Sequence, residues 1–94
     1  MPPVEIYTTR WCSYCHAAKA LLAKKGVAVT EIDVTGDWKG REAMIQRANG
    51  RTTVPQIFIG TTHVGGSDDL HALERAGKLD PLLGRQDGQE GLRA

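Results

Sequence analysis

The chain has two cysteines, Cys12 and Cys15, and their spacing and position constrain its fold more than any other feature. The apolar-alternating run Val4–Tyr7 precedes them, and a helical pattern that includes Leu21 and Leu22 follows. A Cys-x-x-Cys pair at a strand-to-helix junction is typical of a redox dithiol. Residues three apart in a first helical turn are neighbours, so the two sulfurs can join as a disulfide or separate as thiols. The unpaired N–H groups and dipole of the helix start favour a thiolate on Cys12, the species that attacks disulfides.

Size and composition indicate one ordinary globular domain. The chain has 94 residues, of which 40% are hydrophobic and 24% charged, and its net charge is +1. This balance gives no strong field for nucleic acid or a membrane surface. No apolar run approaches the roughly 18 residues of a membrane span. We expect no secretory signal, because the N-terminus enters the first strand at once. A lone cysteine pair in a reducing cytosol is typically catalytic or metal-binding, so we expect a cytoplasmic protein.

Periodicity and turn residues predict the order βαβαββα, with a four-stranded mixed sheet flanked by helices on both faces. In the second strand the apolar phase shifts, which indicates a bulge or a late start. Ser67 or Asp68 is expected to cap the third helix, and Asp80-Pro81 to open a last short turn. The expected strands are Val4–Thr8, 27–34, 53–59 and a short one from His63, and the expected helices are 13–25, 38–48 and one that ends at Gly77.

We expect residues 1–84 to form the domain. Residues 85–94 are polar and glycine-rich, and we expect them to be a disordered C-terminal tail.

Two other interpretations of the cysteine pair compete with the redox dithiol. A structural zinc site needs four ligands, and His16, His63 and His71 lack the paired spacing of a zinc motif. Cys12-x-x-Cys15-His16 also matches the attachment pattern of c-type haem, which requires an exported chain and a second axial ligand. The absence of a secretory signal and the number of strands favour the redox dithiol.

Two further segments have alternative interpretations. A cis Val54-Pro55 bond would turn the Val54 backbone toward whatever docks at Cys12, whereas a trans proline would simply begin an edge strand. The glycines before Ser67 and Asp68 allow a close approach to a helix N-terminus, which can bind a carboxylate. Helix capping alone explains Ser67 and Asp68 equally well.

Three motifs together resemble the glutaredoxins, most closely the short bacterial dithiol type. They have the family's order and spacing, and the resemblance runs from about Val4 to Leu83. They are Tyr7-Thr8 with Cys12-Ser13-Tyr14-Cys15, then Thr53-Val54-Pro55-Gln56-Ile57-Phe58-Ile59-Gly60, then Gly65-Gly66-Ser67-Asp68-Asp69-Leu70.

The resemblance implies a thioredoxin fold with Pro55 cis and a glutathione-dependent thiol–disulfide oxidoreductase. Cys12 and Cys15 would be catalytic, and glutathione would be the reductant. The partners of this protein would be disulfide-containing or glutathionylated proteins, and the chain would act as a monomer. The residues expected to bind glutathione are Tyr14, Thr53, Val54, Pro55, Gly66, Ser67 and Asp68, with Arg10 or Arg41 for its glycine carboxylate.

The chain departs from the family pattern at three positions. Many glutaredoxins have a lysine where Thr9 stands, and many have a proline at Ser13. Relatives with a tryptophan at the position of Trp11 and a serine inside the motif resemble iron–sulfur carriers. The alternative function is therefore a [2Fe–2S] cluster held by Cys12 and glutathione in a homodimer, with no other metal expected.

Overall fold

The computed structural model describes residues 2–84, so the tail expected at 85–94 lies outside the described residues. The elements follow the predicted order, and the last short turn expected near Asp80 is a short helix. They are β1 (Val4–Thr8), α1 (Ser13–Lys24), β2 (Val29–Asp33), α2 (Trp38–Arg47), β3 (Gln56–Ile59), β4 (Thr62–Gly65), α3 (Ser67–Arg75) and α4 (Leu79–Leu82).

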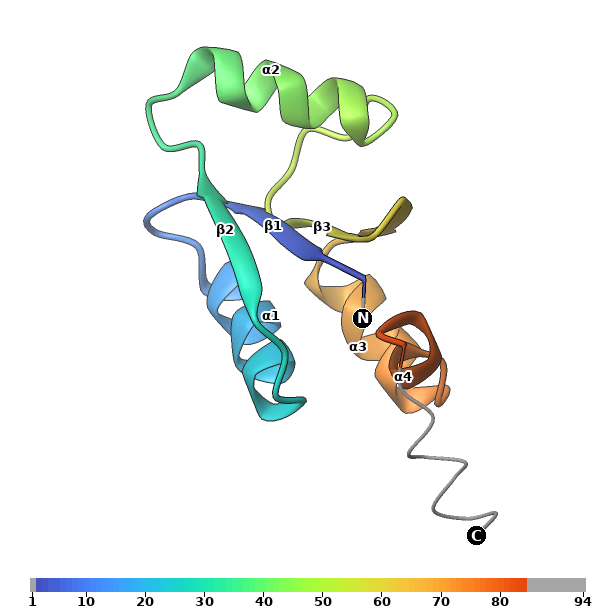
Figure 1. Ribbon diagram of the computed structural model, residues 1–94. Helices are drawn as coiled ribbons and strands as arrows, with labels where there is room; N and C mark the ends of the chain where they lie inside the picture. Colours follow the sequence, from blue (N-terminus) through green and yellow to red (C-terminus); the bar gives the residue numbers. More distant parts are fainter. Residues whose placement is uncertain (1, 85–94) are drawn as a thin grey trace, which may run out of the picture.

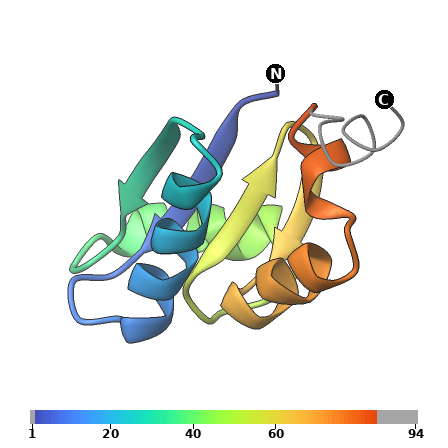
Figure 2. The same cartoon turned by 90° about the horizontal axis from the view of Figure 1, so that it is seen from below.

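One mixed sheet organises these elements, in the strand order β2-β1-β3-β4. β1 pairs with β2 in parallel and with β3 antiparallel, and β3 pairs antiparallel with β4. Helix α2 covers one face of the sheet, and α1, α3 and α4 lie on the other (Figures 1 and 2). The predicted α/β architecture, a thioredoxin fold with helices on both faces, is confirmed.

The sheet separates two apolar clusters. The larger one joins the sheet to α1, α3 and α4, and its fully buried members include Ile6, Leu22 and Leu70. The smaller one joins the sheet to α2 through Met44 and Ala48. Alternation along β1 explains the division, because successive side chains of a strand point to opposite faces.

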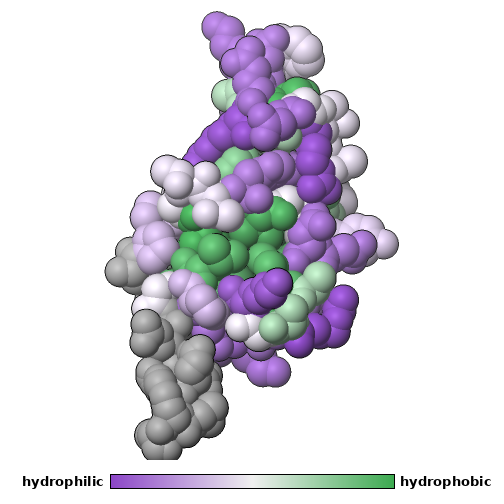
Figure 3. Space-filling model, turned by 90° about the vertical axis from the view of Figure 1, so that its right-hand side faces the viewer, coloured by the Kyte–Doolittle hydropathy of each residue, from purple (hydrophilic) through white to green (hydrophobic). Residues whose placement is uncertain are grey.

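The larger cluster reaches the surface beside α3 and α4. Its partly buried members include Val64, Leu73 and Leu82. Figure 3 shows the side of the molecule that lies to the right in Figure 1, with apolar residues gathered amid hydrophilic ones. No helix in the described part of the chain is long and apolar enough to cross a membrane.

Two strands begin later than predicted. β2 starts at Val29, which confirms the late start, while Val27 is already buried in the core. β3 starts at Gln56 rather than Thr53. Pro55 has no N–H to donate to the ladder, so strand pairing begins after it.

The predicted starts of the last two helices were wrong. Gly66 is the N-cap of α3, and the Asp69 carboxylate accepts a hydrogen bond from the Gly66 N–H at 2.9 Å. Ser67 and Asp68 therefore lie inside the helix instead of capping it. α4 begins at Leu79, so Asp80-Pro81 lies within its first turn. Proline is tolerated there because the first N–H groups of a helix have no partner in the helix.

Candidate functional site

Cys12 lies at the junction between the loop after β1 and helix α1. It is the N-cap residue of α1, with φ −130° and ψ 104°, and its Sγ accepts a hydrogen bond from the Cys15 N–H at 3.1 Å. The first turn of α1 contains no acidic residue. The helix N–H groups and dipole are therefore directed at the sulfur, an arrangement that stabilises an anion there.

Cys15 lies one helical turn behind Cys12 and is 1% exposed. Burial, which would strip the thiolate of its hydration, and the hydrogen bond with Cys12 together raise the pKa of its thiol to about 12. Both cysteines are free thiols in this structure. The site thus combines a half-buried sulfur at the helix start with a buried sulfur that keeps its proton.

The segment before β3 forms the opposite wall of the site. The Val54-Pro55 peptide bond is cis, as the resemblance implies. The Val54 carbonyl oxygen lies 3.9 Å from the Cys12 Sγ. The cysteine loop and this segment therefore lie next to each other, although they are far apart in sequence.

A buried glutamine supports this segment from beneath. Gln56 is 0% exposed, and its Nε2 donates to the Thr53 carbonyl oxygen at 2.9 Å. The Gln56 Oε1 accepts from His63 Nε2 at 2.7 Å, since a carbonyl oxygen can only accept. The His63 ring also stacks on Phe58, with ring centroids 4.8 Å apart. A chain of hydrogen bonds thus connects β4 to Thr53 at the site.

A groove of about 260 Å³ lies between this segment and the N-terminus of α3. Several of the predicted glutathione-binding residues line it together: Tyr14, Thr53, Val54, Pro55, Gly66, Ser67 and Asp68. Tyr14 is exposed, and Asp68 has no hydrogen-bond partner among the described residues. The groove therefore has polar groups that remain available to a ligand.

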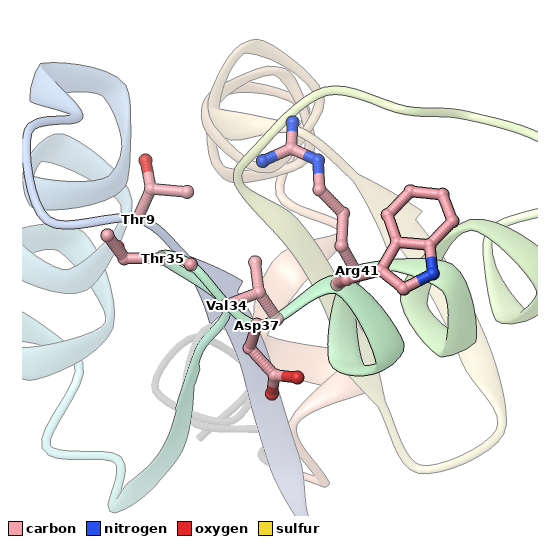
Figure 4. Close-up of a pocket in the computed structure, with 7 residues that line it drawn as sticks. Thr9, Val34, Thr35, Asp37 and Arg41 are labelled. Atoms are coloured by element: carbon pink, nitrogen blue, oxygen red, sulfur yellow. The ribbon is translucent and has the colours of Figure 1, made fainter.

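The two predicted cations lie elsewhere. Arg41 lines a second cavity of about 450 Å³, together with Thr9 and Trp38, and its Nη2 donates to the Thr52 carbonyl oxygen at 3.0 Å. Figure 4 shows Arg41 projecting to the same side as Thr9, whereas Asp37 points away. Arg10 lines neither cavity, and its guanidinium lies 5.2 Å from the Trp11 ring centroid.

Sequence reasoning missed Arg51 and Asp69, which also line the groove. The Arg51 Nη1 donates to the Asp69 Oδ2 at 3.2 Å. Hydrogen bonding from the Gly66 N–H lowers the pKa of Asp69, and Arg51 lowers it further. An acid three residues after a helix N-cap is a recognisable signal for Asp69. No local pattern marks Arg51, because its partner lies on another element.

No group of three or more His, Cys, Asp or Glu side chains among residues 2–84 is arranged to hold a metal ion. His16 follows Cys15 on α1, while His63 lies on β4 and His71 on α3.

The thioredoxin fold, with a dithiol at the start of α1 facing a cis-proline segment, defines a thiol–disulfide oxidoreductase. The glutaredoxin family model matches residues 4–64. The chain is 64% identical to a glutaredoxin of Pseudomonas aeruginosa, over 88% of this chain and 98% of that one. It is 59% identical to glutaredoxin 3 of Escherichia coli, over 88% and 99% of the two chains. The chain belongs to the glutaredoxin family, whose members are glutathione-dependent thiol oxidoreductases.

Solved structures are similar to this chain over most of its length. The solution structure of a Brucella melitensis glutaredoxin has a TM-score of 0.78 and 57% identity, covering 88% of this chain and 89% of that one. The crystal structure of a buckwheat glutaredoxin–glutathione complex also has a TM-score of 0.78, at 33% identity, and covers 87% of this chain and 76% of that one.

The environment of His63 predicts a pH-dependent stability. Burial lowers the pKa of His63 from its ordinary value of 6.5, and the charges of Arg51 and Arg47 lower it further against an opposing effect of Asp69. Above about pH 6.5 the ring is neutral in both the folded and the unfolded state. As the pH falls below that value the unfolded state binds the proton first, so the free energy of unfolding decreases until the native pKa is reached.

Urea unfolding of the wild type and of His63→Gln, measured between pH 5 and pH 7.5, tests this expectation. The wild type should lose more stability than the variant toward low pH, because glutamine cannot take up the proton. Identical pH profiles for the two proteins would show that His63 does not contribute to the acid sensitivity.

Proposed function

We propose that the chain reduces glutathione mixed disulfides through Cys12 and protein disulfides through Cys12 and Cys15 together. The observation that carries this proposal is the Cys12 sulfur at the N-cap of α1, 3.9 Å from the Val54 carbonyl oxygen. Val54 also lines the groove that reaches the start of α3, so the sulfur lies close to one wall of this groove. The complex of the similar buckwheat protein with glutathione supports glutathione as the ligand.

In the mixed-disulfide reaction, the Cys12 thiolate attacks the glutathione sulfur. A bond forms between these two sulfurs, the original disulfide breaks, and the substrate leaves as a thiolate that takes up a proton. A second glutathione thiolate then attacks the glutathione sulfur on Cys12. Oxidised glutathione leaves, and the Cys12 thiolate is restored.

Protein disulfides require the second cysteine. The Cys12 thiolate forms a mixed disulfide with the protein substrate, and Cys15 loses its proton and attacks the Cys12 sulfur. The reduced protein leaves, and a Cys12–Cys15 disulfide remains, which two glutathiones reduce. The raised pKa of Cys15 fits this order, because a buried neutral thiol does not compete with Cys12 for the first attack.

We propose that glutathione binds along the groove as a short added strand. Its cysteine backbone would pair with Val54, and its γ-glutamyl end would meet Ser67 and Asp68 at the start of α3. Its glycine carboxylate would lie toward Thr53 and Arg41, whose guanidinium is anchored on the Thr52 carbonyl oxygen. We assign Arg10 no contact, because it lines neither cavity and its guanidinium lies over the Trp11 ring.

We further propose that the chain works as a monomer in the cytoplasm, on disulfide-containing and glutathionylated proteins. Reduced glutathione is abundant in that compartment and keeps thiols reduced there. Glutathione reductase would then return the oxidised glutathione to its reduced form.

The roles of the two cysteines can be separated by substitution. Cys12→Ser should lose both activities, because the only sulfur at the helix start is removed. Cys15→Ser should keep the reduction of a glutathionylated peptide and lose the reduction of a protein disulfide. Both rates can be followed in a glutathione-coupled assay. If Cys15→Ser lacks both activities, the proposed division between the cysteines is wrong.

Asp68 should recognise the γ-glutamyl ammonium. Asp68→Asn should lower kcat/KM for a glutathionylated peptide several-fold, because a hydrogen bond to a charged group contributes about 1.5–3 kcal/mol, and less in water. The same peptide capped with cysteamine, which lacks the γ-glutamyl end, is the control. Gly66 is the N-cap of α3, so the change leaves the cap intact. An unchanged ratio between the two substrates would exclude this contact.

A second candidate function is binding of a [2Fe–2S] cluster in a homodimer. Cys12 is half-buried while Cys15 is buried, so each copy presents one accessible sulfur. Trp11 beside it is 83% exposed, which leaves an apolar surface next to that sulfur. Cys12 would provide one ligand from each copy, and glutathione in the groove would provide another.

Anaerobic reconstitution with iron, sulfide and glutathione tests this function. Visible absorption together with a dimer in size-exclusion chromatography would support it. Both signals should persist in Cys15→Ser and disappear in Cys12→Ser. Absorption that survives in Cys12→Ser would show that the iron binds elsewhere.

A further inference from the structure

Arg51 connects the two walls of the groove. It lies between α2 and β3, two residues before Thr53, and its Nη1 donates to the Asp69 Oδ2 of α3 at 3.2 Å. The same oxygen accepts from the Gly66 N–H at 2.9 Å. The guanidinium therefore lies at the end of the groove where α3 begins.

The two glycines before α3 leave room for this ion pair. A Cβ atom on Gly65 would lie 2.6 Å from the Arg51 Nη1 and would also meet the Asp69 carboxylate. A Cβ atom on Gly66 would lie 3.8 Å from the Arg51 Nη2. The guanidinium is thus packed directly against the Gly65-Gly66 backbone, which limits where it can move.

The charged side chains at this end of the groove differ in how many hydrogen bonds they form. The Asp69 carboxylate is bonded twice, whereas the Asp68 carboxylate has no hydrogen-bond partner among residues 2–84. The side chain of Arg51 is 47% exposed, and only its Nη1 is bonded within the described part of the chain. A guanidinium has five N–H donors in a planar fork that matches a carboxylate. One cation and one anion therefore both remain open to a ligand in the same groove.

This arrangement matches the γ-glutamyl end of glutathione, where one carbon bears an ammonium and a carboxylate. We propose that Arg51 is a specificity-determining residue that donates to this α-carboxylate while Asp69 holds its guanidinium in position. Asp68 is then left for the ammonium. The inference rests on the proposed function, because it assigns one end of the same glutathione groove.

Two glutathione analogues separate the two charges. The tripeptide γ-aminobutyryl-Cys-Gly lacks the α-carboxylate, and glutaryl-Cys-Gly lacks the ammonium. Mixed disulfides of one peptide with glutathione and with each analogue are compared by kcat/KM. The wild type should lose about tenfold on removal of the carboxylate, because a charge-assisted hydrogen bond disappears.

With the glutathione mixed disulfide, Arg51→Gln should have a kcat/KM about tenfold lower than that of the wild type. With the γ-aminobutyryl-Cys-Gly disulfide, the variant and the wild type should have the same kcat/KM. The variant should still discriminate against glutaryl-Cys-Gly, because Asp68 is intact. Arg51→Lys should recover part of the loss, since it keeps the charge without the fork. Arg75→Gln removes an exposed arginine from the last turn of α3 and is the matched control, which should behave as the wild type.

Equal losses in Arg51→Gln with all three substrates would overturn the proposal and leave Arg51 as a structural link to Asp69. Unchanged kinetics in Arg51→Gln, or a wild type insensitive to loss of the carboxylate, would overturn it as well. Failure of the proposed function has a different signature, because the wild type would then not prefer the glutathione disulfide to the cysteamine disulfide.

Discussion

The hydrogen bond from the Cys15 N–H to the Cys12 sulfur is the interaction on which the site depends. It makes the reactive sulfur part of the helix start, where otherwise unpaired N–H groups need an acceptor. The same geometry buries Cys15 under the first turn of α1. Two cysteines three residues apart thereby acquire different chemistry, because one is half-buried beside the Val54 carbonyl group and the other is buried in the core.

The sheet brings the remaining parts of the site to this helix. β1 ends just before the cysteine loop, and β3 begins just after the cis-proline segment. Because β1 and β3 are antiparallel neighbours with Tyr7 opposite Gln56, the end of one strand meets the start of the other. β4 then carries the chain from β3 to the start of α3. The groove is thus formed at one edge of the sheet by three loops, each fixed by a strand or helix.

Some polar groups around the groove are buried and paired, whereas others are exposed and open to a ligand. Gln56 is fully buried and is bonded to both Thr53 and His63. Such buried groups keep a fixed geometry, because losing a partner there leaves an unpaired polar atom. Asp68 is exposed, and Arg51 forms a hydrogen bond only through its Nη1 within the described part of the chain, so both side chains can bind a ligand. The buried, paired groups fix the shape of the groove, and the exposed, unpaired groups can bind what enters it.

Local sequence patterns specify most of the secondary structure and the cysteine site of this protein. Cys12 and Cys15, the helices after them and the order of strands and helices along the chain all follow from short-range patterns, and the three motifs identify the glutaredoxin family. The local patterns predicted later starts for α3 and α4 than the structure has. Helix α3 is capped at Gly66, where the Asp69 carboxylate accepts from the Gly66 N–H. Helix α4 starts at Leu79, whose side chain is buried in the core.

Which charges meet at the groove depends on how the strands and helices pack. Arg51 and Asp69 are 18 residues apart and lie on different elements, so neither residue's neighbours in sequence reveal the pair. Arg10 and Arg41 had equal standing in the sequence, yet Arg10 lies over Trp11 and Arg41 is anchored on Thr52. The physical reason is that long side chains reach several ångströms from the backbone. Their partners are therefore set by the packing of strands and helices, which no local pattern records.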